Sequence, residues 1–319
     1  MAWCWPEGGV PNGPLKPEIT TKGTVVLIFL LQGLNLPLDQ LRQGLRDWRL
    51  HLFVQFFCFI LFPLATLGLV VSGMIPVPWA PGFLFLAILP TTISTAIVYT
   101  SASGGDSVAA TFNATLSNLL GILAVPLWCA FFVFPMEGVA MTEASPDGFF
   151  SEFLAKLLWL IVTPLCVGLW FPRFLSKEDS ARRKRFLRNI SYGCVLFIAY
   201  AGFCQGFLGS GKNTGTIWWE ALLLASILLV LVKCLAWGLG GLLGFERNRR
   251  LPAFFCASQK SLAVGLPMGQ LLFGLEHPKL FVLLLPLILY HMLQLLVGAI
   301  LLGRWQNNES AMFRVEDSL

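Results

Sequence analysis

The stretch FFCASQKSLAVGLPM, at residues 254–268, places one lysine inside an apolar segment. Lys260 is the only formally charged residue between Arg250 and Glu276, and Pro267 follows it in the same segment. If this segment crosses a bilayer, a charge at its centre costs at least about 2.5–3.5 kcal/mol, which makes Lys260 a candidate functional residue. An interrupted helix is tolerated in a membrane where it lines a cavity. The stretch therefore predicts a broken helix beside an internal site.

The composition indicates a membrane protein. Of the 319 residues, 56% are hydrophobic and 12% are charged, against about 25% charged in soluble domains. The eight cysteines form no CxxC pair and no Cys/His ligand spacing. We therefore expect one integral membrane domain over residues 1–319, multi-pass in a bacterial inner membrane or plasma membrane, with the lipid bilayer as a partner, no nucleic acid partner, no cofactor and no metal.

Apolar runs interrupted by Gly, Pro and charged residues predict an all-α protein with nine transmembrane helices. Most runs approach the roughly 20 residues that a helix needs to cross the hydrocarbon core. The helices are expected at 23–37, 50–75, 82–102, 106–134, 149–172, 188–209, 216–245, 251–273 and 279–303.

Basic residues are unevenly distributed among the loops. They concentrate in 38–49, 173–187 and 246–250, whereas 135–148 has none. Because cytoplasmic loops carry the excess of Lys and Arg, the N-terminus is expected outside and a tail at 304–319 in the cytoplasm. The basic cluster at 173–187 is thereby explained as a membrane anchor and not as a nucleic-acid site.

The two halves of the chain show traces of an inverted repeat, with a first repeat at 23–134 and a second at 149–303. Gln32-Gly33 and Gln205-Gly206 end oppositely directed spans, and Asn118 roughly corresponds to Gln294. Secondary transporters are often built this way, with binding sites at broken helices near the membrane midplane.

In this register the third span corresponds to the eighth, and both are poor membrane helices. The third reads LPTTISTAIVYTSASGGD at 89–106, with Pro90 before a run of small hydroxyl residues. We therefore expect two crossing broken helices, with Thr95 and Lys260 lining a common polar cavity.

Five segments resemble the bile acid:sodium symporter family, more closely its sodium/bile acid cotransporter 7-like branch. They are GPLKPEIT (13–20), LHLFVQ (50–55), FNATLSNLLG (112–121), SQKSLAVGLPM (258–268) and LILYHMLQLLVG (287–298). The resemblance implies ten helices in two inverted five-helix repeats, a panel domain, a core domain and alternating access. The chain offers nine spans, so the family's first helix has no counterpart in this reading.

The chain departs from the family pattern at the expected sodium ligands. Gln259 is kept, but Phe255 stands where sodium-coupled members have a Glu, and Thr95 and Ala96 stand where they have a Ser-Asn pair. These departures argue against sodium coupling by the family mechanism. The coupling cation, Na⁺ or H⁺, stays open.

Two interpretations of Lys260 remain. Its ammonium either occupies the place of a bound cation, so that transport does not need sodium, or it bonds broken-helix carbonyls and only stabilises the crossover. Lys233, in the apolar run ILLVLVKCLAWGLGG, is expected to extend toward the inner interface instead.

The remaining candidates for substrate or ion binding are uncharged polar residues within the spans. Hydroxyl and amide oxygens suit cations and polar solutes, but packing between helices explains such residues as well. The candidate set is Lys260, Gln259, Ser258 and Ser261; Thr92, Ser94 and Thr95; Asn113, Thr115 and Asn118; His291 and Gln294; and Gln55.

The predicted function is secondary active transport of a small, anionic organic solute. The anion preference rests on Lys260 and on the positive ends of half-helices. The alternative is an ion-handling regulatory membrane protein that binds a cation or partner without carrying solute. An enzyme is not expected, because the spans lack a nucleophile with a base or a metal set, and no GxxxxGK[ST] loop is present.

Overall fold

The computed structural model describes residues 8, 14, 17–35, 47–136, 149–170, 180–209, 214–274, 277 and 279–316. Within these ranges every regular element is a helix. The elements are α1 (Pro17–Asn35), α3 (Trp48–Phe56), η2 (Phe57–Leu61), α4 (Phe62–Val71), η3 (Val77–Trp79), α5 (Ala80–Ile88), α6 (Ser94–Ala102), α7 (Ser107–Trp128), η4 (Cys129–Val133), α8 (Phe134–Met136), α9 (Phe149–Trp170), α10 (Ser180–Gly209), α11 (Thr214–Leu242), α12 (Arg247–Ser258), α13 (Leu262–Phe273) and α14 (Leu280–Glu316).

The helices confirm the all-α membrane class. Four described stretches are long and apolar enough to cross a membrane, namely Trp48–Val71, Ser107–Met136, Thr216–Leu242 and Leu280–Trp305. The other predicted spans coincide with shorter apolar helices, with the more polar α10, or with helices that are interrupted. The helix α10 begins at Ser180, eight residues before the predicted sixth span at 188–209.

Several predictions on the loops concern residues without a description. The ranges 38–46, 137–148 and 171–179 lie outside the described residues, as does the side chain of Gln205. The expected membrane orientation and the Gln205-Gly206 correspondence therefore stay predictions.

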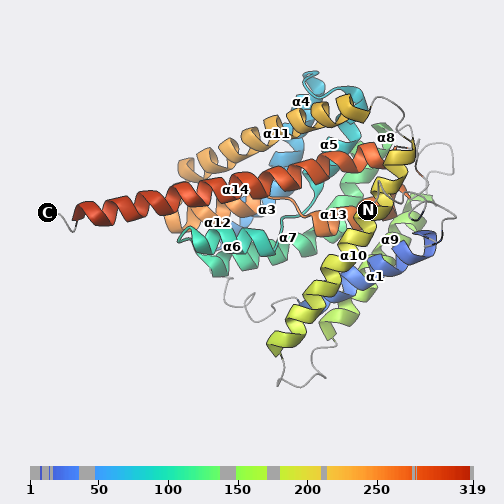
Figure 1. Ribbon diagram of the computed structural model, residues 1–319, viewed down its shortest axis with the longest axis horizontal. Helices are drawn as coiled ribbons and strands as arrows, with labels where there is room; N and C mark the ends of the chain where they lie inside the picture. Colours follow the sequence, from blue (N-terminus) through green and yellow to red (C-terminus); the bar gives the residue numbers. More distant parts are fainter. Residues whose placement is uncertain are drawn as a thin grey trace.

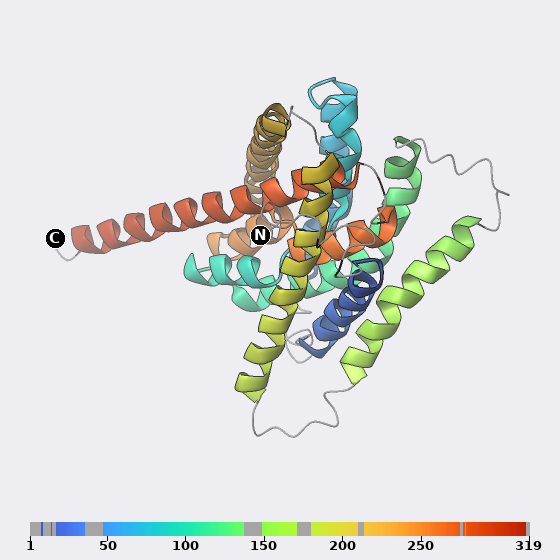
Figure 2. The same cartoon turned by 45° about the vertical axis from the view of Figure 1, so that its right-hand side comes forward.

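The helices form two groups (Figures 1 and 2). In one group α1 packs against α9 and α10, and in the other α5, α11, α12, α13 and α14 pack together with α3, α4, α6 and α7. The helix α14 runs along the second group and projects beyond it toward the C-terminus (Figure 1). The two groups meet mainly where α10 contacts α13 and α14 and where α9 contacts α7.

Two glycines bring α1 and α9 into backbone contact. A Cβ atom on Gly33 would overlap the carbonyl oxygen of Leu165, and one on Gly168 would overlap that of Leu30. Small residues allow membrane helices to approach this closely, and van der Waals packing then holds them together. The pair α1–α9 is therefore a tightly packed unit.

Two long helices widen into π-helical turns at the same sequence signature. The segments η2 and η4 each end one residue before a Phe-Pro pair, Phe62-Pro63 and Phe134-Pro135. In each, the N–H of the phenylalanine bonds the carbonyl five residues back, Phe57 or Cys129. A proline ring clashes with the carbonyl four residues before it, and the wider turn relieves this clash. The turn also changes which carbonyls keep a helical donor.

Candidate functional site

The third predicted span is broken, as expected, between α5 and α6. Every residue of α5 is buried, and the helix ends at Ile88. Leu89 adopts an extended conformation (φ −68°, ψ 151°) because the ring of Pro90 disfavours a helical residue before it. The last carbonyls of α5 thus lose their helical N–H donors at a fully buried position.

The eighth predicted span is broken between α12 and α13. Gln259 is extended (φ −93°, ψ 146°), and Ser261 opens the next helix by accepting a 3.3 Å hydrogen bond from the Val264 N–H. Serine is a preferred residue at such a helix start because its oxygen satisfies an otherwise unpaired N–H group. The break is therefore short and well defined.

The two breaks contact each other. The Ser261 N–H donates to the Pro90 carbonyl at 2.9 Å. The side-chain oxygen of Gln259 accepts hydrogen bonds from Thr92 at 2.8 Å and Thr95 at 2.9 Å. Buried polar groups require such partners, and these bonds fix the register of one interrupted helix on the other.

Two amide side chains hold the backbone at the breaks. Asn118 of α7 donates to the Thr91 carbonyl at 3.0 Å. Gln294 of α14 accepts from the Lys260 N–H at 2.8 Å and donates to the Lys260 carbonyl at 2.9 Å. Each amide thereby replaces hydrogen bonds that a continuous helix would have made.

The ammonium of Lys260 is enclosed by backbone oxygens. Its Nζ atom donates to the carbonyls of Ala87 at 2.6 Å, Leu89 at 2.7 Å and Cys58 at 3.0 Å, and the Phe62 ring lies 4.2 Å away. The side chain has no exposed surface. All three donors of the ammonium are used.

The second buried lysine corrects the expectation for Lys233. It does not extend toward an interface, since it is 6% exposed and donates to the Ser258 hydroxyl at 3.3 Å. Its Nζ atom also lies 4.5 Å from the centre of the Phe254 ring. The amino group therefore sits at the C-terminal end of α12, where the helix dipole favours a cation.

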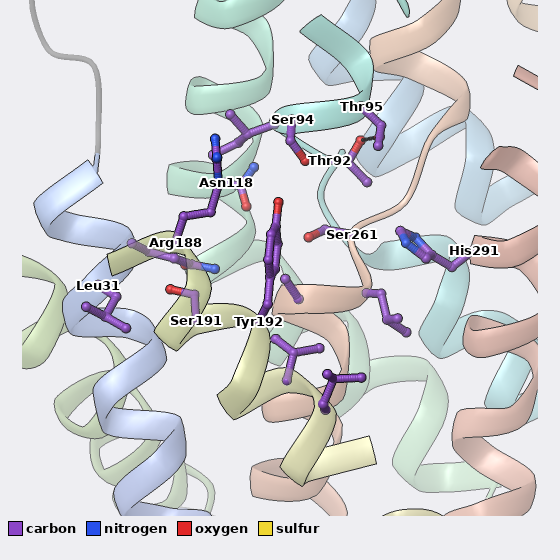
Figure 3. A pocket seen from close by; sticks show the side chains of 16 residues that line it. Leu31, Thr92, Ser94, Thr95, Asn118, Arg188, Ser191, Tyr192, Ser261 and His291 are labelled. Atoms are coloured by element: carbon purple, nitrogen blue, oxygen red, sulfur yellow. Dashed lines mark hydrogen bonds between the residues drawn. The ribbon is translucent and has the colours of Figure 1, made fainter. Parts of the chain in front are cut away.

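A cavity of about 700 Å³ lies between α10 and the two interrupted helices. The two breaks and the first residues of the helices that follow them line it, including Thr92, Ser94, Thr95 and Ser261 (Figure 3). Asn118 and His291 also line it, together with Gln32 of α1. Lys260 is not among its lining residues, so this cavity is not the one that Thr95 and Lys260 are expected to share.

Helix α10 contributes residues that the sequence analysis did not select. Arg188, Ser191 and Tyr192 line the cavity, and the side chain of Tyr192 extends toward Ser94 and Ser261 at the breaks (Figure 3). Arg188 adjoins the basic cluster at 173–187, for which the sequence predicts a loop. Only the earlier start of α10 places this arginine two turns inside a helix. Among the described residues, no carboxylate lines the cavity.

The orientation of Gln294 determines the state of His291. The Nδ1 atom of His291 lies 2.8 Å from the Gln294 amide nitrogen and 3.4 Å from the Lys260 carbonyl. Because the Lys260 N–H can only donate, the oxygen of Gln294 must face it, so the amide nitrogen donates to Nδ1 over the shorter contact and the longer one is not a hydrogen bond. A neutral imidazole with an accepting Nδ1 carries its proton on Nε2. His291 therefore has an N–H group to offer at the edge of the cavity.

The predicted candidates fall into three places. Six line the cavity: Thr92, Ser94, Thr95, Asn118, Ser261 and His291. Four lie behind it at the breaks: Ser258, Gln259, Lys260 and Gln294.

The other three candidates, Gln55, Asn113 and Thr115, are not among the lining residues. Asn113 contacts His51 at 3.2 Å, and the amide of Gln55 donates to the Asn113 carbonyl at 3.1 Å. This polar contact between α3 and α7 is the packing alternative considered for these two residues.

Known proteins with similar sequences include several that are named as transporters. The model of the SBF-like CPA transporter family matches residues 1–307. The chain is 33% identical to sodium/bile acid cotransporter 7 of Danio rerio over 93% of this chain and 87% of that protein. It is 30% identical to sodium/bile acid cotransporter 7 of Mus musculus, covering 93% and 86%, and 30% identical to the putative symporter YfeH of Escherichia coli (strain K12), covering 94% and 88%.

Proposed function

Because the chain belongs to the SBF-like CPA transporter family, we propose that it carries a small organic anion across the membrane by alternating access. The family and its relatives make the chain a secondary active transport protein and not an enzyme. This agrees with the resemblance read from the sequence. The class of solute and the way it crosses are the proposal.

The observation that carries the proposal is the sign of charge around the cavity. The N-terminal ends of α6 and α13 open into it, and Arg188 lines it. Helix N-termini bear partial positive charge and unpaired N–H groups, which favours anions. At the start of α6 the capping position is held by Ile93, whose side chain accepts no hydrogen bond. These N–H groups are suited to a carboxylate or sulfonate.

The cavity also suits an apolar body attached to that anionic group. Val195 and Leu196 of α10 and Leu262 of α13 line it beside the polar groups. Ligand sites are mostly apolar, with a few polar groups that fix orientation. The hydroxyl of Tyr192 and the Nε2–H of His291 are further donors for polar substituents of the solute.

The position of the cavity supports alternating access. Its lining comes from α1 and α10 of one helix group and from α6, α7, α13 and α14 of the other. A solute held there contacts both groups, so a movement of one group against the other would expose it to either side of the membrane. Transporters with inverted repeats commonly rock in this way around a fixed site.

We include in the proposal nine membrane spans arranged as an inverted repeat. The equivalent roles of Asn118 and Gln294 support it, because each bonds the break that precedes it in its own repeat. The two π-helical turns before Pro63 and Pro135 do not support the inverted repeat, because both lie in the first repeat.

The names of the relatives indicate which solute to test first. Those from Danio rerio and Mus musculus are called sodium/bile acid cotransporters, so a bile acid is the first anion to test and Na⁺ is the ion whose requirement has to be tested. A bile acid joins one acidic group to an apolar skeleton, as the lining requires.

Uptake by purified protein in liposomes tests the proposal. A radiolabelled bile acid should accumulate inside the vesicles, whereas a neutral alcohol with the same skeleton should not compete for uptake. Arg188→Gln should weaken binding of the acid about tenfold or more, since a hydrogen bond to a charged group contributes about 1.5–3 kcal/mol.

Arg185→Gln is the matched control, because it removes the same charge from an exposed position of α10 that is not among the lining residues. It should leave binding unchanged. Equal competition by the acid and the neutral alcohol would contradict an anion site. Tight binding without any uptake would favour the regulatory protein that the sequence analysis kept as its alternative.

A further inference from the structure

We propose that a side chain of the protein supplies the cation at the crossing of the two interrupted helices. In this proposal the Lys260 ammonium permanently fills a cage of backbone carbonyls that would otherwise bind a free metal cation, so that Na⁺ does not bind there and transport proceeds without it. The inference rests on the proposed function for its meaning in transport, but the cage itself stands on the contacts of Lys260.

The cage is formed by parts of the chain that are distant in sequence. The Nζ atom of Lys260 is bound by Cys58 of η2, by Ala87 near the end of α5 and by Leu89 in the break. In the sequence, Ala87 is 173 positions from the lysine, Leu89 is 171 and Cys58 is 202. Carbonyl oxygens converging on one point are what proteins use to replace the hydration shell of an alkali cation.

Each of the three carbonyls is free for a reason that does not involve the lysine. In η2 the Phe62 N–H bonds Phe57, five residues back, and Pro63 has no N–H, so the Cys58 carbonyl has no helical donor. The N–H of Thr91, which a continuous helix would give to Ala87, is taken by the Ser117 hydroxyl at 3.2 Å. Leu89 lies beyond the end of α5. The acceptors would therefore exist without Lys260 and would need a cation or another donor.

The field at this point also favours a cation. The C-terminal end of α5 points its partial negative charge at the cage, and the face of Phe62 adds the attraction of its ring. The ammonium donates to three backbone oxygens and not to a carboxylate. Its charge is thus held by dipoles alone, as a bound metal ion would be held in the same cage.

Lys233 provides the contrast needed for a test. It is also buried in the same helix group, but its Nζ atom has one hydroxyl oxygen at 3.3 Å and aromatic rings around it, and no cage of carbonyls from the described part of the chain. Removing Lys233 should therefore leave no empty cation site. If both lysines only filled space, the variants at positions 260 and 233 would respond in the same way to added cations.

The test measures the melting temperature of purified protein in NaCl, KCl and choline chloride at equal ionic strength. Lys260→Ala empties the cage, and Na⁺ or K⁺ should then raise its melting temperature by several degrees over choline, which is too large to enter. The unmodified protein and Lys233→Ala should show no difference between the three salts. A ligand that binds only the folded state raises its stability in this way.

Two results would overturn the proposal. One is a Lys260→Ala protein that is equally stable in all three salts, and the other is an unmodified protein stabilised by Na⁺ over choline. Neither measurement involves a solute, so failure of the proposed anion transport leaves this test intact.

Lys260→Gln provides a second test of the cation cage if the alanine variant does not fold. Glutamine retains two N–H donors for the cage but has no charge. It should fold, remain indifferent to the salts and lose solute uptake, whereas uptake at the normal rate would overturn the proposal. Uptake by the unmodified protein should be the same in NaCl and in choline chloride, and a strong dependence on Na⁺ would also overturn it.

Discussion

The two sides of the helix crossing present helix ends of opposite partial charge, and the chain neutralises only one of them. On the buried side, the C-terminal ends of α5 and α12 are each approached by a lysine, Lys260 and Lys233. On the cavity side, the N-terminal ends of α6 and α13 carry no carboxylate among the described lining residues. A helix end of either sign is stabilised by an opposite charge. The chain provides that charge on the buried side, and in the proposed function an anionic solute provides it on the cavity side.

Removing the charge on the buried side should have the largest effect on stability. Lys260→Met keeps most of the side-chain volume but leaves three buried carbonyls without a donor. Each unsatisfied buried acceptor costs about 1–3 kcal/mol, so the free energy of unfolding should fall by several kcal/mol. Melting temperature and yield of folded protein measure the loss. A variant as stable as the unmodified protein would mean that the cage relaxes or admits water.

The amides that hold the breaks should come next. Gln294→Ala leaves the Lys260 N–H without its partner and leaves the Lys260 carbonyl with only the 3.4 Å contact to His291, at a cost of roughly 2–3 kcal/mol. Asn118→Ala leaves one carbonyl, that of Thr91, without its partner and should cost about half as much. Thermal unfolding of the two variants side by side measures the difference. If Asn118→Ala were the more damaging, the first break and not the second would determine the stability of the crossing.

Lys233→Met should have a smaller effect, within about 1 kcal/mol in either direction. The Ser258 hydroxyl keeps its own bond to the Phe254 carbonyl at 2.7 Å, so the substitution leaves no buried polar group without a hydrogen bond. A cation over an aromatic ring contributes about 0.5–1 kcal/mol at exposed sites, and the cost of burying the charge offsets part of that. Thermal unfolding of Lys233→Met beside Lys260→Met measures this difference. A loss as large as that of Lys260→Met would erase the distinction between the two lysines.

The smallest effect on stability is expected on the cavity side, and its sign is opposite. Ser94→Asp puts a carboxylate at the first turn of α6, which should raise the free energy of unfolding by about 0.3–1 kcal/mol. The same carboxylate occupies the proposed anion site, so bile acid binding should be lost. Ser101→Asp, in the last turn of the same helix, is the control, since it should lower stability slightly and leave binding intact. Retained binding in Ser94→Asp would remove the α6 end from the site.

Much of the framework was predictable because its causes are local. Pro90 and the polar run Ser258–Ser261 interrupt apolar segments, and the structure breaks the helices at 89–93 and 259–261. The six cavity residues found in advance all lie within or near those breaks or on the helices that hold them. A missing N–H group or a capping hydroxyl acts within one helical turn, so its effect can be read from neighbouring residues.

The partners of each side chain were less predictable. Arg188 and Tyr192 were missed because they belong to the cavity only through the packing of α10 against the breaks. Lys233 was misjudged because the apolar residues around it in sequence give no sign of Ser258, 25 positions away.

By itself the sequence determined the helical class, the approximate limits of the apolar helices, both interruptions and the presence of a buried charge at the second one. Only the tertiary structure decided that Lys260 turns away from the cavity and into a cage formed by Cys58, Ala87 and Leu89. The reason is physical. A buried ammonium takes the direction in which unpaired oxygens are found, and those oxygens belong to helices that meet it only after the chain has folded.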